Sequence, residues 1–337
     1  MNRVFFLHPR WQKGGVETTN ERWAAILSKL GKRSIAFTCD SDTNKIHNME
    51  VINAKSLYHL LLLEVTKLKR NDVLLVCQSY YILKILPFII YLRLRGVRLI
   101  ITERNSFDQF NDFPIKQKIY EYLFPLVFLL FDKIIVNSVE MSAETIYRFS
   151  KDRLVVIKNP RFTEADLTLL MRQKPLYPSK IIYTFCRWAP QKDPDFMVAV
   201  GEFCKQKNFD FTVFCNQKAY DFQKPLVNSA FVYMKNNPGI LFFASKFEGY
   251  PNILIEARAL GLPIIFAACN TGVREILEGY ERAFEFRKSD MKSFEAAVRF
   301  AQDSARSQKC QPDTEFAIIH SERMVNVNLF KSAFCLD

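Results

Sequence analysis

Residues 246–265 read KFEGYPNILIEARALGLPII, and this stretch decides how the second half of the chain folds. Pro251 and Asn252 are typical of the first positions of a helix that follows a loop. The apolar spacing after them predicts a helix over 252–260, and 263–267 has the composition of a buried strand. The order strand, loop, helix, strand is typical of a parallel sheet with crossover helices.

The same alternation runs along the whole chain, with further helices expected near 17–30 and 195–207. The expected strands are Arg3–Leu7, Ser34–Thr38, Val73–Cys77, Val97–Thr102, Lys133–Val136, Leu154–Ile157, Lys180–Phe185, Phe211–Cys215, Ile240–Ala244 and Pro263–Ala267. Residues 161–179 are polar and contain two prolines, which predicts a linker.

The fold class that follows is α/β, with two Rossmann-like doubly wound domains facing across a cleft. We expect an N-terminal domain over 1–165, a second domain over 166–309, and a helical tail over 310–337 that packs back toward the first domain. Ligands of such sheets bind outside the carboxyl ends of the strands, where helix N-termini offer N–H groups, so the crevice between the domains is the expected site.

Charge is distributed unevenly. The net charge is +12, and residues 1–160 hold 24 Lys and Arg against 15 Asp and Glu, whereas 161–337 hold 23 against 20. A basic surface attracts phosphate-rich partners. We expect peripheral contact with an anionic membrane or a lipid-linked sugar rather than nucleic acid, with a solvated basic face as the alternative.

The cysteine spacing and the lengths of the apolar runs argue against a disulfide-rich, zinc-binding or transmembrane protein. None of the eight cysteines forms a CxxC pair or lies near a histidine at metal-ligand spacing, so we expect free thiols, a reducing cytoplasm and no metal. No uncharged apolar run reaches the ~18 residues that suggest a transmembrane helix, and residues 1–9 resemble a strand rather than a signal peptide.

Three weaker signals are interpreted structurally. Asp40-Ser41-Asp42 follows a strand of a doubly wound sheet, where a metal site is not expected. His8 ends the first strand and is expected to be a structural histidine. Residues 120–135 are expected to be a buried helix and the following strand, with a segment resting on a membrane surface as the alternative.

The opening stretch also carries chemistry. Gly249 lets the backbone approach a ligand closely, and the N–H groups near Tyr250 and Ile253 are suited to holding a diphosphate. Glu248 and Glu256 lie on either side of the helix start, where carboxylates can bind sugar and ribose hydroxyls. The alternative is a dipole partner and a surface carboxylate.

The run FEGYPNILIEARALGLPII resembles the donor-site motif of glycosyltransferase family 4, retaining enzymes with the GT-B fold. Other segments resemble this family in the same order along residues 13–276. They are the glycine loop Lys13-Gly14-Gly15-Val16-Glu17, the pre-linker segment Val156–Pro160, the phosphate-binding segment Arg187–Lys192 and the donor-closing loop Gly272–Ile276.

The resemblance implies roles for particular residues. Arg187 and Lys192 would neutralise the donor diphosphate, and Glu248 would lie near the donor sugar, which makes these three the expected catalytic residues. The implied donor-binding residues are Gly14, Gly15, Glu103, Arg104, Asn105, Gly249, Tyr250, Pro251, Asn252, Ile253 and Glu256. No metal and no cofactor is implied, because the nucleotide sugar is a substrate.

The sequence departs from the family pattern in two places. Cys186 and Trp188 flank Arg187 where many members have Gly and Leu or Phe. Residues 216–239 must contain both a loop and a helix, so the residues that recognise the base are not identified.

The implied reaction moves a sugar from a nucleoside diphosphate, expected to be a UDP-hexose or UDP-N-acetylhexosamine, to a hydroxyl of a glycan or lipid-linked acceptor. Glu103-Arg104-Asn105 resembles a run in members that build bacterial surface polysaccharide or lipopolysaccharide on the cytoplasmic side of the membrane. The rivals are an inactive nucleotide-sugar-binding or scaffold protein, and an inverting transferase or phosphorylase of the same fold. A nicotinamide dehydrogenase would need G-x-G-x-x-G after the first strand, which is not present.

Overall fold

The computed structural model describes residues 3–11, 14–40, 46–173, 178–269, 272–307 and 310–336. The chain divides into two compact units. The first unit comprises Met1–Arg161 with Met324–Asp337, and the second comprises Phe162–Arg323. Residues 310–323, which the sequence analysis assigns to the tail, therefore belong to the second unit. No helix within the described ranges combines the length and apolarity that a bilayer crossing requires.

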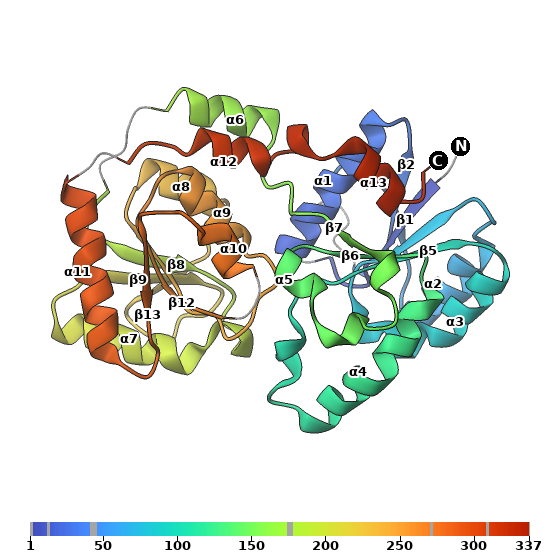
Figure 1. The fold of residues 1–337 in the computed structure, drawn as a ribbon, viewed down its shortest axis with the longest axis horizontal. Helices are drawn as coiled ribbons and strands as arrows, with labels where there is room; N and C mark the ends of the chain where they lie inside the picture. The colour runs from blue at the N-terminus through green and yellow to red at the C-terminus, as the bar shows by residue number, and fades with distance from the viewer. Residues whose placement is uncertain are drawn as a thin grey trace. The chain divides into compact units, whose positions relative to one another are not determined.

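The first unit is built on a seven-stranded parallel sheet in the order β3-β2-β1-β4-β5-β6-β7 (Figure 1). Its strands are β1 (Arg3–Leu7), β2 (Arg33–Thr38), β3 (Glu50–Asn53), β4 (Val73–Val76), β5 (Arg98–Thr102), β6 (Lys133–Val136) and β7 (Leu154–Val156). The strand order reverses between β1 and β4, where Phe5 pairs with Ile35 on one side and Leu74 on the other. Strand β3 was not predicted from the sequence, because this four-residue edge strand has no buried residue.

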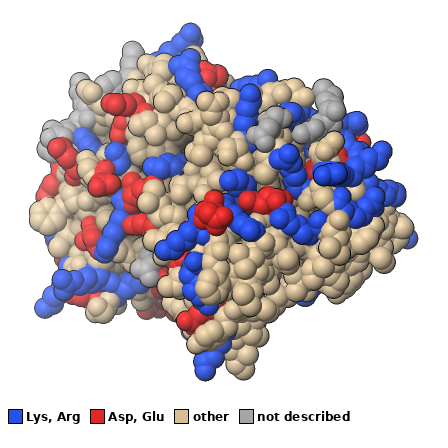
Figure 2. All heavy atoms as spheres, turned by 45° about the vertical axis from the view of Figure 1, so that its right-hand side comes forward, with Lys and Arg blue, Asp and Glu red and all other residues tan. Residues whose placement is uncertain are grey.

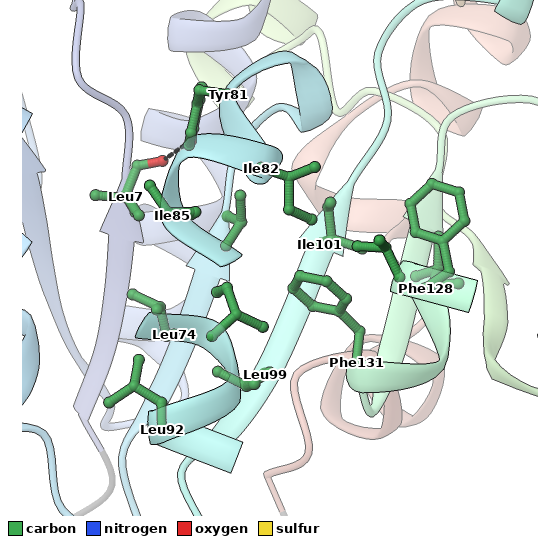
Figure 3. Packing of buried hydrophobic residues seen from close by; sticks show 14 of the residues in the cluster. Leu7, Leu74, Tyr81, Ile82, Ile85, Leu92, Leu99, Ile101, Phe128 and Phe131 are labelled. Atoms are coloured by element: carbon green, nitrogen blue, oxygen red, sulfur yellow. Dashed lines mark hydrogen bonds between the residues drawn. The ribbon is translucent and has the colours of Figure 1, made fainter. Parts of the chain in front are cut away.

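Helices cover both faces of this sheet. They are α1 (Gly15–Lys29), α2 (Leu57–Leu63), α3 (Ile82–Leu94), α4 (Pro114–Val127), α5 (Val139–Ser142) and α13 (Val327–Ala333), with 3-10 turns η2 (Val65–Lys67), η3 (Ser79–Tyr81), η4 (Phe107–Phe110), η5 (Phe128–Leu130), η6 (Thr145–Tyr147) and η7 (Lys151–Arg153). Buried residues of α2, α3 and α4 share one core with one face of the sheet, and α1 and α13 pack against the other. Figure 3 shows the first core, where the Tyr81 hydroxyl donates to the Leu7 carbonyl at 2.5 Å.

The end of the chain completes the second of these cores. Phe330 on α13 and Phe334 at the C-cap of this helix are buried, and their ring centroids lie 6.3 and 5.5 Å from that of Trp23 on α1. Trp23 is itself fully buried, so α13 supplies part of the environment of the largest side chain in this core.

The second unit is built on a six-stranded parallel sheet in the order β10-β9-β8-β11-β12-β13. Its strands are β8 (Ile182–Phe185), β9 (Phe211–Cys215), β10 (Gln223–Pro225), β11 (Ile240–Phe243), β12 (Ile264–Ala267) and β13 (Ala283–Phe286). Its helices are α6 (Glu164–Met171), α7 (Pro194–Gln206), α8 (Ala230–Asn236), α9 (Asn252–Ala259), α10 (Val273–Leu277), α11 (Met291–Ser307) and α12 (Thr314–Ile319), with η8 (Pro190–Lys192), and η9 (Glu322–Met324) follows α12. The order reverses between β8 and β11, which makes this the switch point of the sheet.

The expected linker over 161–179 is wrong in its first half, because this segment contains α6. Thr163 and Asp166 form a capping box, in which each side chain accepts a hydrogen bond from the other's backbone N–H. Leu167 and Leu170 are buried against the core of the second unit. Both signals are present in the sequence, but the neighbouring prolines obscured them.

We predict that Phe334→Ala lowers the free energy of unfolding of the first unit by about 3–5 kcal/mol, because it opens a cavity beside Trp23. Urea unfolding followed by fluorescence measures the loss. Leu329→Ala, at a 42% exposed position on the same helix, is the control and should change the free energy by less than ~0.5 kcal/mol. Equal losses in the two variants would contradict the packing of α13.

Candidate functional site

The switch point of the second sheet brings a lysine and a glutamate together. Lys192 lies in the loop that follows β8, and Glu248 lies in the loop that follows β11. The Lys192 ammonium donates a hydrogen bond to a Glu248 carboxylate oxygen and lies 3.4 Å from the Ser245 hydroxyl oxygen. Glu248 is only 7% exposed, so the ion pair is largely buried at the carboxyl ends of the strands.

Backbone hydrogen bonds hold these two loops in register. The Lys246 amide donates to the Gln191 carbonyl at 2.8 Å, and the Gln191 side-chain amide donates to the Phe247 carbonyl at 3.1 Å. Asp193 has a left-handed backbone (φ 56°) at the start of α7. Its carboxylate accepts a hydrogen bond from the Lys288 ammonium at 2.8 Å.

Helix α9 begins beside Glu248. Pro251 is its N-cap, and the first amides of a helix have no acceptor within the helix. The Leu254 amide already bonds to the Pro251 carbonyl at 3.1 Å, which leaves the amide of Ile253, together with the positive end of the helix dipole, to act on an anion.

The predicted donor-binding residues around this helix start play different parts. The Tyr250 side chain points into the core, where its hydroxyl lies 2.8 Å from His320 Nε2, so only its backbone faces the loop. Glu256 is 6% exposed on the first turns of α9. Arg187 is exposed in the loop after β8 and has no ion pair among the described residues.

Gly272 lies in the loop between β12 and α10, and this loop contacts the loop that contains Glu248 and Gly249. Its φ is +69°, and an added Cβ would lie 2.0 Å from the Gly249 carbonyl oxygen. The backbone of Gly249 therefore contacts position 272 closely, and only a residue without a side chain fits at 272. The two sequence segments FEGYPN and GVREI therefore lie in neighbouring loops that touch each other.

The sequence analysis missed Lys288, which follows β13. Its ammonium bonds to Asp193 and lies 3.5 Å from the Ser245 carbonyl oxygen, so it adds a second cation to the loop cluster. A lysine two residues after a strand end was the available signal, but neither β13 nor α11 was assigned from the sequence. Another missed contact is Asn216, which accepts the Trp188 amide proton at 2.7 Å.

Cys186 is not a nucleophile in this setting. Burial raises the pKa of its thiol to about 12, although Lys192 opposes the shift. The side chain packs 4.0 Å from the Met197 sulfur. The thiol therefore stays protonated near neutral pH and behaves as a small apolar group.

In the first unit, Glu103 and Arg104 follow β5 and lie in different surroundings. The Arg104 guanidinium lies 4.2 Å from the ring centroid of Trp23 and donates to Asn159 Oδ1 at 3.0 Å. Burial lowers its pKa to about 10, so the group remains charged at neutral pH. Within the described ranges, Arg104 Nε and Nη2 have no hydrogen-bond partner.

The surroundings of Glu103 favour the protonated form of its carboxyl group. Burial raises the pKa of its carboxyl to about 8, and a Ser79 hydrogen bond only partly opposes this. Burial likewise raises the pKa of the nearby Glu144 to about 7, with the Phe107 amide as a bonding partner at 3.0 Å. The Glu103 Oε1 atom has no hydrogen-bond partner among the described residues.

The remaining predicted residues lie at the same edge of the first sheet. Gly14 is the N-cap of α1 and Gly15 its first residue, while Lys13 lies outside the described residues. Asn105 is half-buried after β5. His8 Nε2 lies 3.0 Å from the Glu17 carboxylate, a buried structural pairing.

The metal and disulfide predictions concern other positions. Asp40 is described, but Ser41 and Asp42 are not. In the part of the chain that is described, no three His, Cys, Asp or Glu side chains are grouped to hold a metal ion. All eight cysteines are free thiols.

Comparison of the sequence with family models and with curated proteins finds no match. Solved structures match over nearly the whole chain. HepE of Anabaena, in complex with UDP and glucose, has 16% identity and a TM-score of 0.70, with 98% of each chain covered. A TarM variant of S. aureus, in complex with UDP among other ligands, has 10% identity and a TM-score of 0.74, with 98% of this chain and 100% of that chain covered.

The lipopolysaccharide outer core galactosyltransferase WaaB has 14% identity and a TM-score of 0.62, with 98% of each chain covered. At these identities the likeness concerns the fold. The chain therefore has the α/β architecture of GT-B glycosyltransferases, with seven and six parallel strands in its two sheets.

We predict that Gly272→Ala destabilises the second unit more than Gly279→Ala. Both glycines have positive φ values, +69° and +67°, but only Gly272 would place a Cβ against backbone. Gly279→Ala should cost about 1–2 kcal/mol from the left-handed backbone alone. Thermal unfolding of the two variants makes the comparison, and similar midpoints would disprove the contact with Gly249.

We predict that Glu103→Gln changes how stability depends on pH. Native Glu103 and Glu144 keep protons that the unfolded chain releases above the ordinary carboxyl pKa of 4.5. The free energy of unfolding should therefore fall as pH rises from about 5 to about 8. Glu103→Gln removes the larger part of this slope and should be more stable than the wild type at pH 8 by at least about 1 kcal/mol.

Urea titrations between about pH 5 and 8 measure the slope. Glu140→Gln, at an exposed position on α5 of the same unit, is the control and should leave it unchanged. A wild-type slope in Glu103→Gln would mean that the carboxyl is ionised in the native state.

Proposed function

We propose that this protein is a retaining glycosyltransferase of family 4 that binds a nucleoside-diphosphate sugar at the carboxyl edge of the second sheet. The observation that carries the proposal is the Lys192–Glu248 pair at the switch point between β8 and β11. A cation and a carboxylate at that point, beside the start of α9, suit a substrate that joins a diphosphate to a sugar.

The diphosphate is bound by positive charge from two sources. Lys192 and Arg187 supply full charges, and the start of α9 supplies the Ile253 amide and the helix dipole. These groups act most strongly when the sugar leaves, because the negative charge on the diphosphate then grows. Lys288 adds charge to the same loops through Asp193 and Ser245.

Glu248 is placed to act on the sugar. Its carboxylate holds Lys192 in position and accepts hydrogen bonds from sugar hydroxyls, whereas Glu256 binds the ribose. In the first unit, Gly14, Gly15 and the Glu103–Asn105 segment contact the transferred sugar or the acceptor. These roles rest on the family resemblance and on the position of each residue at the carboxyl edge of its own sheet.

The chemical step needs little from side chains. The leaving phosphate oxygen takes the proton of the acceptor hydroxyl as that hydroxyl attacks the anomeric carbon from the same face, and the bond to the diphosphate breaks. The protein positions the two substrates and stabilises the charge that develops. The configuration of the anomeric carbon is retained.

The donor we infer is a UDP-hexose or UDP-N-acetylhexosamine, supported by the UDP complexes of the HepE and TarM structures. The acceptor is a glycan or lipid-linked hydroxyl in bacterial surface polysaccharide or lipopolysaccharide synthesis, as with WaaB. The eight free thiols favour the cytoplasm. No metal or cofactor is part of this proposal.

We predict that Lys192→Ala and Arg187→Ala each lower turnover by about 100-fold or more, because each removes a charge that stabilises the leaving diphosphate. Release of nucleoside diphosphate from a panel of nucleotide sugars measures turnover, and thermal shift measures donor binding. Lys205→Ala, an exposed lysine on α7, is the control and should match the wild type.

Wild-type rates in both variants would refute the assignment. Donor binding without turnover in the wild-type protein would favour the alternative, an inactive nucleotide-sugar-binding or scaffold protein. An anomer-resolved NMR spectrum of the product separates retention from inversion, and dependence on free phosphate would reveal a phosphorylase.

A further inference from the structure

Helix α3 is apolar on two opposite faces. Its inner face packs on the first sheet through Ile82, Ile85, Ile89 and Leu92, all buried. Its outer face carries Leu83, Pro87, Ile90 and Leu94, all exposed, at the spacing of one helical stripe. Leu94 is 84% exposed. A helix that is apolar all round usually has a partner on both sides.

Helix α4 repeats this arrangement. Its inner face is formed by Tyr120, Phe124 and Val127, which are buried. Its outer face carries Ile115, Ile119, Tyr122 and Leu126, again at the spacing of one stripe and all exposed. Helix α2 adds the exposed side chains of Tyr58, Leu62 and Leu63.

These stripes lie on one side of the first unit, because α2, α3 and α4 cover the same face of its sheet and share one core. Figure 2 shows a wide area in its lower right part that is largely free of Lys, Arg, Asp and Glu, bordered above by Lys and Arg with some Asp and Glu among them. We call the exposed apolar side chains of the three helices the α2–α3–α4 surface. Soluble monomers rarely expose apolar side chains in such contiguous numbers.

Basic side chains flank this surface. Lys84 lies on α3 beside the stripe, Lys116 and Lys118 lie in the first two turns of α4, and Lys69 and Arg70 follow η2. All five are exposed, and none has an ion pair among the described residues. Helices α2 and α3 contain no acidic residue, and α4 contains only Glu121. Glu64 follows α2, and Asp108 and Asp112 precede α4, so the flanking charge is mixed, with basic residues in excess.

The apolar side chains and the basic residues beside them favour a lipid surface over a second copy of the chain as the partner of this surface. A second copy of the chain docked face to face would bring two basic borders together, which costs energy at a symmetric interface. An anionic lipid surface receives the apolar side chains at the acyl boundary, while the lysines reach its phosphates and the tyrosines lie at headgroup depth.

We propose that the α2–α3–α4 surface docks the protein on an anionic lipid bilayer, with α3 and α4 lying in the plane of the interface. The proposal goes beyond the transfer reaction and does not depend on it. It places the exposed apolar side chains of α2, α3 and α4 against the bilayer.

Co-sedimentation with vesicles tests the apolar part. We expect the full-length protein to bind phosphatidylcholine vesicles that contain phosphatidylglycerol, and to bind pure phosphatidylcholine vesicles weakly. Leu94→Glu and Ile115→Glu should each lower partitioning about tenfold or more, because a charge replaces a buried apolar group. Phe300→Glu, at a 63% exposed position on α11, is the matched control and should partition as the wild type does.

The charge part has its own test. Lys84→Gln and Lys118→Gln should each lower partitioning about fivefold at low salt, and wild-type binding should weaken as salt is added. Nucleoside diphosphate release with a soluble acceptor should be unchanged in all of these variants. That readout separates a failure of docking from a failure of the proposed reaction.

Two results would overturn the proposal. One is wild-type partitioning in both Leu94→Glu and Ile115→Glu. The other is a dimer in lipid-free solution that these substitutions convert to a monomer, with no vesicle binding by the wild type. That second result would assign the surface to a second copy of the chain.

Discussion

The contact between Lys192 and Glu248 depends on one constraint, that all strands of the second sheet run parallel. Every loop after a strand then opens on the same edge, and the reversal of strand order separates the two helices that follow β8 and β11. Two side chains 56 residues apart in sequence meet there. Gly272 completes the junction, because its missing side chain lets the loop after β12 touch the Gly249 backbone in the loop after β11.

Much of this was predictable from the sequence. Central strands are buried on both faces and have apolar sequences, and Pro251 and Asn252 in FEGYPN predicted the start of α9. Edge strand β3 was missed because it has no buried residue, and helix α6 was missed because neighbouring prolines obscured its capping box and apolar spacing. The inward turn of the Tyr250 side chain and the reach of Lys288 to Asp193 depend on packing between distant segments, which one sequence does not encode locally.

The first unit shows how neighbouring residues acquire different chemistry. Burial raises the pKa of the Glu103 carboxyl to about 8, and the nearby Glu144 adds to this shift. The Arg104 guanidinium beside the Trp23 ring stays charged. Residues 120–135 were expected to be a buried helix and strand or a membrane-surface segment. The helix and the strand are confirmed as α4 and β6, and α4 has a buried face and an exposed apolar face.

A crystal structure of the protein with UDP tests the central claim most directly. The account predicts that the diphosphate oxygens lie within about 3 Å of the Lys192 ammonium and the Ile253 amide. A diphosphate bound elsewhere in the second unit, with the Lys192–Glu248 pair untouched and no oxygen near the start of α9, would contradict it.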